Sequence, residues 1–350
     1  MIPYGRQDIN QADIDSVINV LKSNWLTQGP QVPLFENTST EYCGVKFGVA
    51  VNSATSALHI ACLALGLGEG DYFWTSPNSF VASANCGLYC GAKVDFVDID
   101  PLTYNLSSED LEKKLIQAKN DNKLPKIVIP VHFSGQSCNM KKIHLLSQEY
   151  DFKIITTAEG GLATTNDKEL SERMQLFRSH GVTRDPELMT KESAGGWYYQ
   201  QVDLGFNYRM TELQAALGVS QMERLDEFVA LRHKCQVRYD ELLIDLSITT
   251  PYQDLNSYSA LHLYPIRIQI DKVKSTRKEI FEALRKNDIG VNVHYIPVHT
   301  QPYYENMGFR KGDYPNAENY YESAISIPLF HVMTFEQQDQ VIAALEKVLK

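Results

Sequence analysis

Short apolar runs alternate with helical repeats of apolar residues along the first 160 positions. An uninterrupted apolar run is typical of a strand buried on both faces, whereas apolar residues three or four apart mark one face of a helix. This alternation predicts a doubly wound α/β domain with a large, mostly parallel sheet, whose ligands bind beyond the carboxyl ends of the strands. The expected strands are 47–51, 72–75, 93–97, 127–131 and 152–155, and the expected helices are 58–65, 81–89, around 111–115, and 141–150.

A helix near the N-terminus is expected to lie with one apolar face on the core, behind a possible N-cap at Asn10. That face comprises Ile9, Ile14, Val17, Ile18 and Leu21. Further along, a single long helix is expected to begin at a capping box formed by Thr211 and Gln214. Between these two helices the pattern adds a short strand at 163–167, a helix at 170–177 and a polar loop at 183–201.

A change of composition at 247–259 indicates a boundary between two domains. We expect a large domain at 1–246 and a small C-terminal domain at 247–350, in which strands and helices interleave as in a mixed α+β unit. The expected elements of the small domain are strands at 262–270 and 291–296 and two helices that begin at the capping boxes Thr276/Glu279 and Thr334/Gln337.

Composition limits the classes of partner. The chain has 350 residues, 43% of them hydrophobic, and a formal net charge of −10 without a basic run, which argues against nucleic acid or an anionic membrane as the main partner. Neither a signal peptide nor a membrane span is evident. The six cysteines lack the paired spacing of a zinc site, so we expect no metal, reduced thiols and a cytoplasmic location.

Two stretches carry candidate chemistry. Ser53, Ala54 and Thr55 occupy a turn from strand to helix, where backbone N–H groups and hydroxyls form a candidate phosphate cup, although Ser53 is equally explained as an ordinary N-cap. Lys153 lies in the strand 152–155 and reads either as a solvated residue at a strand edge or as a nucleophile.

Seven motifs give these signals a specific meaning when they are read together. In chain order they are LTQGP, NSATSALH, TSPNSFVASAN, TTAEGG, FRSHG, GFNYRM and VNVHYIPVH. Together they resemble the fold-type I, pyridoxal-phosphate-dependent sugar aminotransferases of the DegT type over nearly the whole chain. Within that family the chain is most similar to the enzymes of pseudaminic acid synthesis, which transfer an amino group from L-glutamate to C4 of a UDP-linked 4-keto-6-deoxy-N-acetylhexosamine.

The resemblance implies a role for each matching residue. Lys153 would form the Schiff base with pyridoxal 5'-phosphate, Ser53, Ala54 and Thr55 would hold its phosphate, and Phe80 would lie against its ring. Asn207 would reach into the neighbouring subunit's site, which implies a homodimer with shared active sites. The residues implied to contact the UDP-sugar are Tyr4, Asn24, Trp25, Leu26, Thr27, Asn292, Val293, His294 and Tyr295.

Each of these assignments has a structural alternative. Phe80 could be a core residue, Asn207 a cap at a helix entry, and His294 a surface residue of a strand.

The chain departs from the family pattern at one point. There, a strand like FKII continues into an acidic turn and a further strand before the lysine and TTAEGG, whereas here FKII runs directly into TTAEGG. A few tens of residues are absent, including the aspartate for the pyridinium nitrogen and one phosphate-binding serine. The junction is explained either by a deletion between two similar KII segments or by a disordered stretch left out of the sequence, and in the second case Lys153 is only the strand lysine.

Two classes of function follow. The first is an aminotransferase with Lys153 as Schiff-base lysine, and the second is a catalytically impaired or silent homologue that only dimerises or binds ligand. A dehydratase, in which histidine replaces the lysine, has less support because a lysine precedes IITTAEGG. A metal enzyme has less still, since no cluster of ligands is apparent.

Overall fold

The computed structural model describes residues 1–157 and 161–349. The elements of the first half are α1 (Gln11–Lys22), α2 (Gln31–Cys43), β1 (Phe47–Ala50), α3 (Ala54–Ala64), β2 (Tyr72–Thr75), α4 (Ala82–Tyr89), β3 (Lys93–Phe96), α5 (Ser108–Asn120), β4 (Ile127–Ile129), the 3-10 helix η1 (Phe133–Gly135), α6 (Met140–Tyr150) and β5 (Lys153–Ile154). Those of the second half are β6 (Leu162–Thr165), α7 (Lys168–Arg178), β7 (Val182–Thr183), β8 (Gln200–Gln201), α8 (Glu212–Met222), α9 (Leu225–Leu242), β9 (Ile248–Thr249), β10 (Tyr264–Ile268), η2 (Ile270–Lys272), α10 (Arg277–Lys286), η3 (Val298–Thr300), α11 (Pro302–Glu305), α12 (Pro315–Ser323), β11 (Ala324–Ile327) and α13 (Phe335–Val348).

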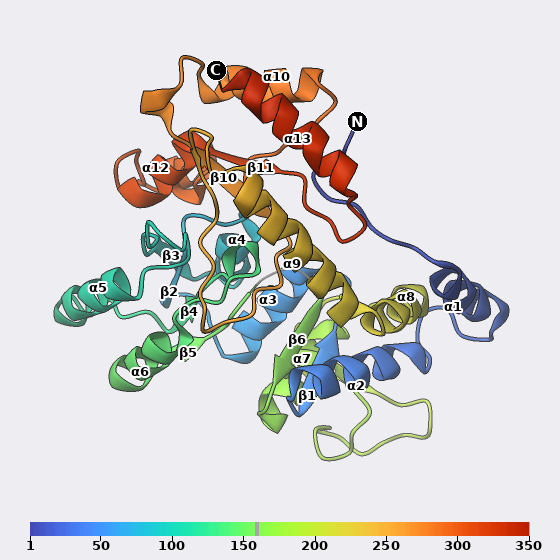
Figure 1. Ribbon diagram of the computed structural model, residues 1–350. Coiled ribbons are helices and arrows are strands. Elements are labelled where there is room, and N and C mark those ends of the chain that lie inside the picture. Colours follow the sequence, from blue (N-terminus) through green and yellow to red (C-terminus); the bar gives the residue numbers. More distant parts are fainter. Residues whose placement is uncertain (158–160, 350) are drawn as a thin grey trace.

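A parallel sheet of four strands in the order β3-β2-β4-β5 forms the centre of the large lobe (Figure 1). β1 and β6 form a separate antiparallel pair, in which Phe47 lies opposite Thr165 and Ala50 opposite Leu162. The side chains of β4 are fully buried, as expected for a strand covered on both faces. These observations confirm the predicted α/β class with a mostly parallel sheet.

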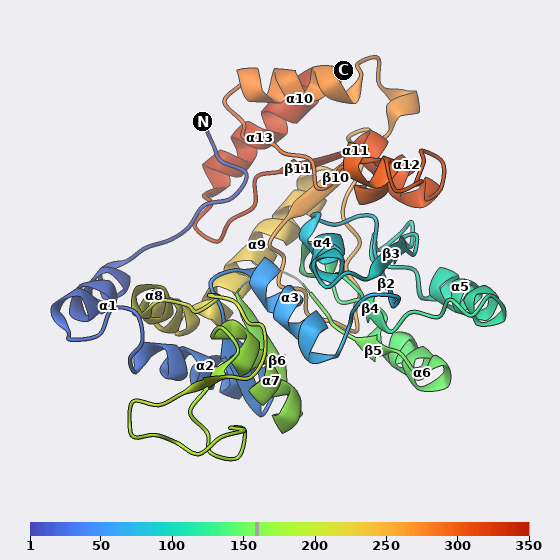
Figure 2. The same cartoon turned by 180° about the vertical axis from the view of Figure 1, so that it is seen from behind.

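The C-terminal lobe is built on an antiparallel sheet in the order β11-β10-β9, which α10 and α13 cover (Figures 1 and 2). Its core also takes in Cys235, Tyr239 and Leu243, which lie on or just after α9, and Ile2 from the N-terminus. Helix α9 therefore contributes to this core from before position 247, and the boundary at 246/247 stays a prediction.

Three sequence expectations were wrong. The apolar face expected to bury α1 is largely exposed, with Ile14 at 42% and Leu21 at 58%, because α1 instead packs on α8 through Asp13 and Val20. The long helix expected after Thr211 is two helices, α8 and α9, and the strand expected at 291–296 forms only the bridge between Asn292 and Ser326. α2, α12 and β11 had not been predicted.

The contact between α1 and α8 depends on a buried carboxylate. Asp13 accepts hydrogen bonds from the Ser220 hydroxyl (2.6 Å) and the Gln221 amide (2.9 Å), and it forms an ion pair with Arg224 (2.6 Å). Burial alone would raise the pKa of Asp13, but these partners outweigh it and lower that pKa. We expect Asp13→Ala to lower the free energy of unfolding by about 3 kcal/mol, because Ser220 and Gln221 lose a buried charged acceptor, while Arg224 keeps its ion pair with Asp8 (2.8 Å). Chemical denaturation checks this, with Asp15→Ala, an exposed change on the same helix, as the control.

Candidate active site

The turn at the N-terminus of α3 has the geometry of a candidate anion site. The Ser53 Oγ accepts the Ser56 N–H (3.2 Å) and so caps the helix, while the Ser56 hydroxyl donates to Asn52 (2.7 Å). The backbone N–H groups of Ala54 and Thr55 belong to the first turn of α3, where no carbonyl of the helix is available to them. The helix dipole adds positive potential at the same place. Both readings of Ser53, as a cap and as part of a phosphate cup, are therefore compatible with this geometry.

A cavity of about 210 Å³ opens beside this turn, at the carboxyl ends of the parallel strands. Phe80 is not a core residue: its ring is 61% exposed and lies on the cavity wall, 6.3 Å between centroids from the ring of Tyr295. The hydroxyl of Ser134 is buried and has no hydrogen-bond partner among the described residues. The cavity is lined by Ala54, Thr55, Leu58, Ser79, Phe80, Ala82, Ser83, Val131, His132, Phe133, Ser134, Thr157, His262, Leu263 and Tyr295.

Two neutral imidazoles complete the polar lining. His132 accepts the Cys138 N–H at Nδ1 (3.1 Å), which leaves its ring proton on Nε2, and burial lowers its pKa. Burial, together with the charges of Arg232 and His294, lowers the pKa of His262 to about 4. At neutral pH both rings are therefore uncharged, and His132 is a hydrogen-bond donor through Nε2.

Lys153 does not reach this cavity. In the ladder between β4 and β5, Ile127 lies opposite Lys153, and the bridge between Val131 and Thr157 follows at the carboxyl end. Thr157 is four positions beyond Lys153 in the strand, a distance of about 13 Å along the chain. The Lys153 side chain is exposed at the amino end of β5, away from the carboxyl ends of the strands. Residues 158–160 of the TTAEGG motif lie outside the described residues.

The segment expected to contact the sugar nucleotide is only partly gathered at the cavity. Tyr295 lines it, whereas His294 is buried against Ser326 (Nδ1 to Oγ, 2.8 Å) and is not a strand surface residue. Burial lowers the pKa of His294 to about 4, and its ring lies 5.6 Å from that of Tyr4. Asn292 and Val293 precede it, half-buried.

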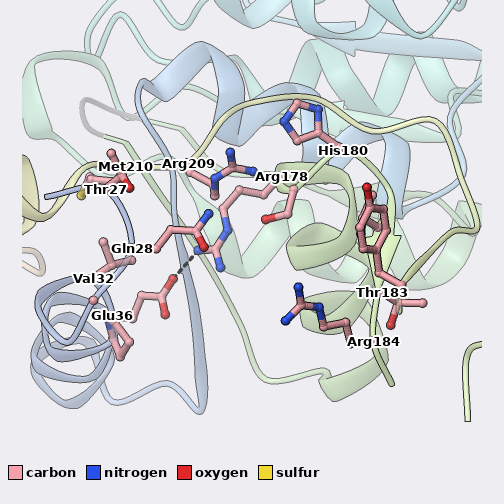
Figure 3. Close-up of a pocket in the computed structure, with 15 residues that line it drawn as sticks. Thr27, Gln28, Val32, Glu36, Arg178, His180, Thr183, Arg184, Arg209 and Met210 are labelled. Carbon is pink, nitrogen blue, oxygen red and sulfur yellow. Dashed lines mark hydrogen bonds and ion pairs between the residues drawn. The ribbon is translucent and has the colours of Figure 1, made fainter. Parts of the chain in front are cut away.

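A second, larger pocket of about 720 Å³ was not predicted. Its lining includes Thr27 and three arginines, Arg178, Arg184 and Arg209, and Figure 3 shows the first and last of these in the middle of the pocket. Arg178 pairs with Glu36 at 2.6 Å, whereas Arg184 and Arg209 have no carboxylate partner in the part of the chain that the structure describes. We call this the arginine pocket; its excess positive charge suits an anionic ligand.

The signal for the arginine pocket was present in the sequence, because Arg178 and Arg209 stand in the motifs FRSHG and GFNYRM. Asn207, from the second motif, is exposed, pairs with Ser179 in a β-bridge and lines neither pocket. Asn24, Trp25 and Leu26 are likewise exposed and line neither pocket.

Known aminotransferases resemble this chain in sequence and in fold. The chain is 33% identical to the UDP-4-amino-4,6-dideoxy-N-acetyl-beta-L-altrosamine transaminase of Campylobacter jejuni, over 100% of this chain and 99% of that protein. The structure of Helicobacter pylori PseC, an aminotransferase of pseudaminic acid biosynthesis, superposes with a TM-score of 0.90 at 27% identity, over 99% of both chains. The PLP form of the putative sugar aminotransferase Spr1654 of Streptococcus pneumoniae superposes with a TM-score of 0.87 at 25% identity, over 100% of both chains. These superpositions confirm the predicted aminotransferase fold.

The described residues suit the phosphate and the ring of pyridoxal 5'-phosphate, the cofactor on which this class of aminotransferase depends. The turn at Ser53, Ala54 and Thr55 suits the phosphate and the exposed face of Phe80 suits the ring. Within residues 1–157 and 161–349, the cavity lining contains neither a lysine nor a carboxylate.

No helix in the described part of the chain is both long and apolar enough to cross a bilayer.

The profile of the DegT/DnrJ/EryC1/StrS aminotransferase family matches residues 7–155 and 150–346. The chain is therefore a member of this family of pyridoxal-phosphate-dependent enzymes, the sugar aminotransferases that act on nucleotide sugars.

Proposed function

We propose that the chain serves the transfer of an amino group from L-glutamate to C4 of a UDP-linked 4-keto-6-deoxy-N-acetylhexosamine, as in pseudaminic acid synthesis. The observation that carries this proposal is the cavity between the α3 turn and Phe80, which joins an anion cup to an aromatic wall. The names of the Campylobacter jejuni and Helicobacter pylori relatives support the choice of sugar. The arginine pocket supports an anionic substrate such as a nucleotide diphosphate.

In this proposal Ser53, Ala54 and Thr55 hold the phosphate of pyridoxal 5'-phosphate, and Phe80 orients the ring. When bound, the cofactor supplies an electron sink for amino transfer. His132 donates a hydrogen bond into the cavity through Nε2, and the apolar side chain of Leu58 limits the access of water.

The proposal includes a homodimer in the cytoplasm. Tyr4, Asn207 and the loop 24–27 lie on exposed surface, which is expected for residues that complete the site of a second copy. The sulfur atoms of Cys62 and Cys86 lie 3.8 Å apart without a bond, and all six cysteines are free, as is usual in a reducing compartment.

We also propose that a segment of the family fold is missing between β5 and β6. The family profile matches in two parts that overlap at 150–155, so the break falls on the FKII run. The alignment to the Campylobacter jejuni transaminase has 389 positions, and at least 39 of them must lie opposite gaps in this chain of 350 residues. If most of these positions fall at the break, the missing segment is long enough to include the Schiff-base lysine and the pyridinium aspartate.

The position of Lys153 favours a second candidate function, that of a homologue that binds ligand without effective catalysis. Lys153 is the Schiff-base candidate by its spacing from TTAEGG, yet it lies at the far end of β5 from the cavity. Borohydride reduction followed by peptide mapping separates the two. Cofactor fixed to Lys153 would support the enzyme, and bound cofactor that is fixed to no lysine would support the silent homologue.

Ligand binding and turnover test the proposal directly. We expect the chain to bind pyridoxal 5'-phosphate and the UDP-linked keto sugar, measured by absorbance titration and calorimetry. Amino transfer from L-glutamate should be at least about 100-fold slower than in the Campylobacter jejuni relative assayed beside it, because the groups that stabilise developing charge are displaced or missing. If neither ligand binds, the proposed function is wrong.

A further inference from the structure

A third cavity, of about 470 Å³, lies between the facing edges of β5 and β6 and adjoins the candidate active-site cavity, with which it shares Ala54, Leu58 and Thr157. One wall is the consecutive run 153–157 and the other is the run 162–165, while α3 and α7 supply the base. Figures 1 and 2 both show α3 between β5 and β6. We call this cavity the interstrand slot. We propose that the interstrand slot binds an extended peptide strand with apolar side chains at alternate positions.

The β5 wall presents backbone groups that the sheet does not use. Lys153, Ile155 and Thr157 donate their N–H groups to carbonyls on the β4 side, at 2.9, 3.1 and 3.2 Å. In a parallel ladder alternate residues face opposite sides, so the N–H and C=O groups of Ile154 and Thr156 are directed away from β4 and into the slot. This edge can therefore pair with another strand.

The β6 wall also directs backbone N–H and C=O groups into the slot. Val51 donates to the Gly161 carbonyl (2.7 Å), and Ala163 lies opposite Val49 in the antiparallel ladder with β1. The alternation of that ladder directs the backbone groups of Leu162 and Thr164 away from β1. Within the described residues, two edges without strand partners therefore face one slot. An inserted strand would form hydrogen bonds with both of them, whereas a strand added to an ordinary sheet edge bonds to one.

The base of the slot sets the chemistry of the occupant. It consists of apolar side chains from α3 and α7, whereas the nearby Thr156 and Thr164 are exposed. A strand in the slot would therefore bury every second side chain and leave the others in contact with water. The apolar residues of the base are Ala54, Ala57, Leu58, Ala61, Leu65, Leu170 and Met174.

The alignments add an independent reason for this occupant. The family profile breaks at 150–155, which is β5 itself, and the Campylobacter jejuni relative has at least 39 residues without a counterpart in this chain. The slot thus opens where the family profile breaks, which is where we propose that the segment is missing. Peptide binding in the slot involves the sheet alone and requires neither amino transfer nor the cofactor.

Peptide binding tests the proposal. The probes are fluorescent synthetic peptides of about ten residues, long enough for one strand with short flanks, that tile the extra segment of the Campylobacter jejuni protein. We expect one peptide with alternating apolar residues to bind saturably to the full chain without cofactor, as measured by anisotropy. The same peptide with N-methyl groups on its backbone should not bind, because it keeps the side chains and loses the donors to both edges.

Variants of the protein locate the bound peptide. Thr156→Pro and Thr164→Pro each remove one N–H that faces the slot, and we expect each to raise the Kd at least about fivefold, whereas Thr156→Val and Thr164→Val keep that N–H and the affinity. Hydrogen exchange at positions 154, 156, 162 and 164 should slow when the peptide binds. The proposal is overturned if no peptide binds saturably, if the N-methylated peptide binds equally well, or if these amides are protected only by self-association of the chain.

Discussion

Inserting the extra segment of the Campylobacter jejuni transaminase between Ile155 and Thr156 should raise the rate of amino transfer by at least about 100-fold. The insertion point lies at the carboxyl end of β5, where the chain passes the candidate cavity. A segment restored there would fill the interstrand slot and would return the lysine and aspartate implied by the family resemblance. The measurement is product formation from L-glutamate and the UDP-linked keto sugar, compared with the parent chain.

A matched insert separates chemistry from folding. An insert of the same length in which the candidate lysine is replaced by alanine should fold and bind ligand but should not gain activity. A Gly/Ser insert of equal length should gain neither stability nor activity, because it cannot pair with both edges of the slot. If all three inserts transfer amino groups at the parent rate, the proposal that a missing segment impairs catalysis is wrong.

The sheet and the turn that begins α3 could be predicted from the sequence because both depend on local pattern. Apolar runs such as Ile127–Ile129 are buried on both faces whatever their neighbours, and a Ser-Ala-Thr turn ahead of an apolar helix face exposes N–H groups wherever it occurs. These features need only the chain on either side of them. The capping box at Thr211 was correct for the same reason, since it is formed within one turn of helix.

Features that depend on distant partners could not be predicted. The burial of Asp13 in α1 requires Ser220 and Arg224, which are more than 200 positions away, and nothing in the local pattern favours a carboxylate over Ile14 on the inner face. Arg178 and Arg209 stand in motifs that the sequence shows, but their meeting in one pocket depends on how segments near positions 30, 180 and 210 come together. The strand register that separates Lys153 from the cavity is likewise set by pairing with β4.

The cup at the N-terminus of α3 allows binding to be tested without loss of the helix. Asp and Asn are both good N-caps, so Ser53→Asp and Ser53→Asn should each keep α3 folded. The aspartate also places a negative charge where the cofactor phosphate would bind. Repulsion between them at about 4 Å is worth at least about 2 kcal/mol even in a watery site, so we expect Ser53→Asp to weaken pyridoxal 5'-phosphate binding by about thirtyfold or more.

Ser53→Asn is the control for this charge effect. The asparagine side chain has nearly the same size as aspartate and caps a helix about as well, but it carries no charge. Its Kd for the cofactor should stay within a few-fold of the parent, and the thermal unfolding of both variants should match that of the parent. Increasing salt should weaken cofactor binding to the parent and narrow the difference between the two variants, because part of the interaction is screened. Equal affinities for the Asp and Asn variants would show that Ser53 is only a cap and that the phosphate binds elsewhere.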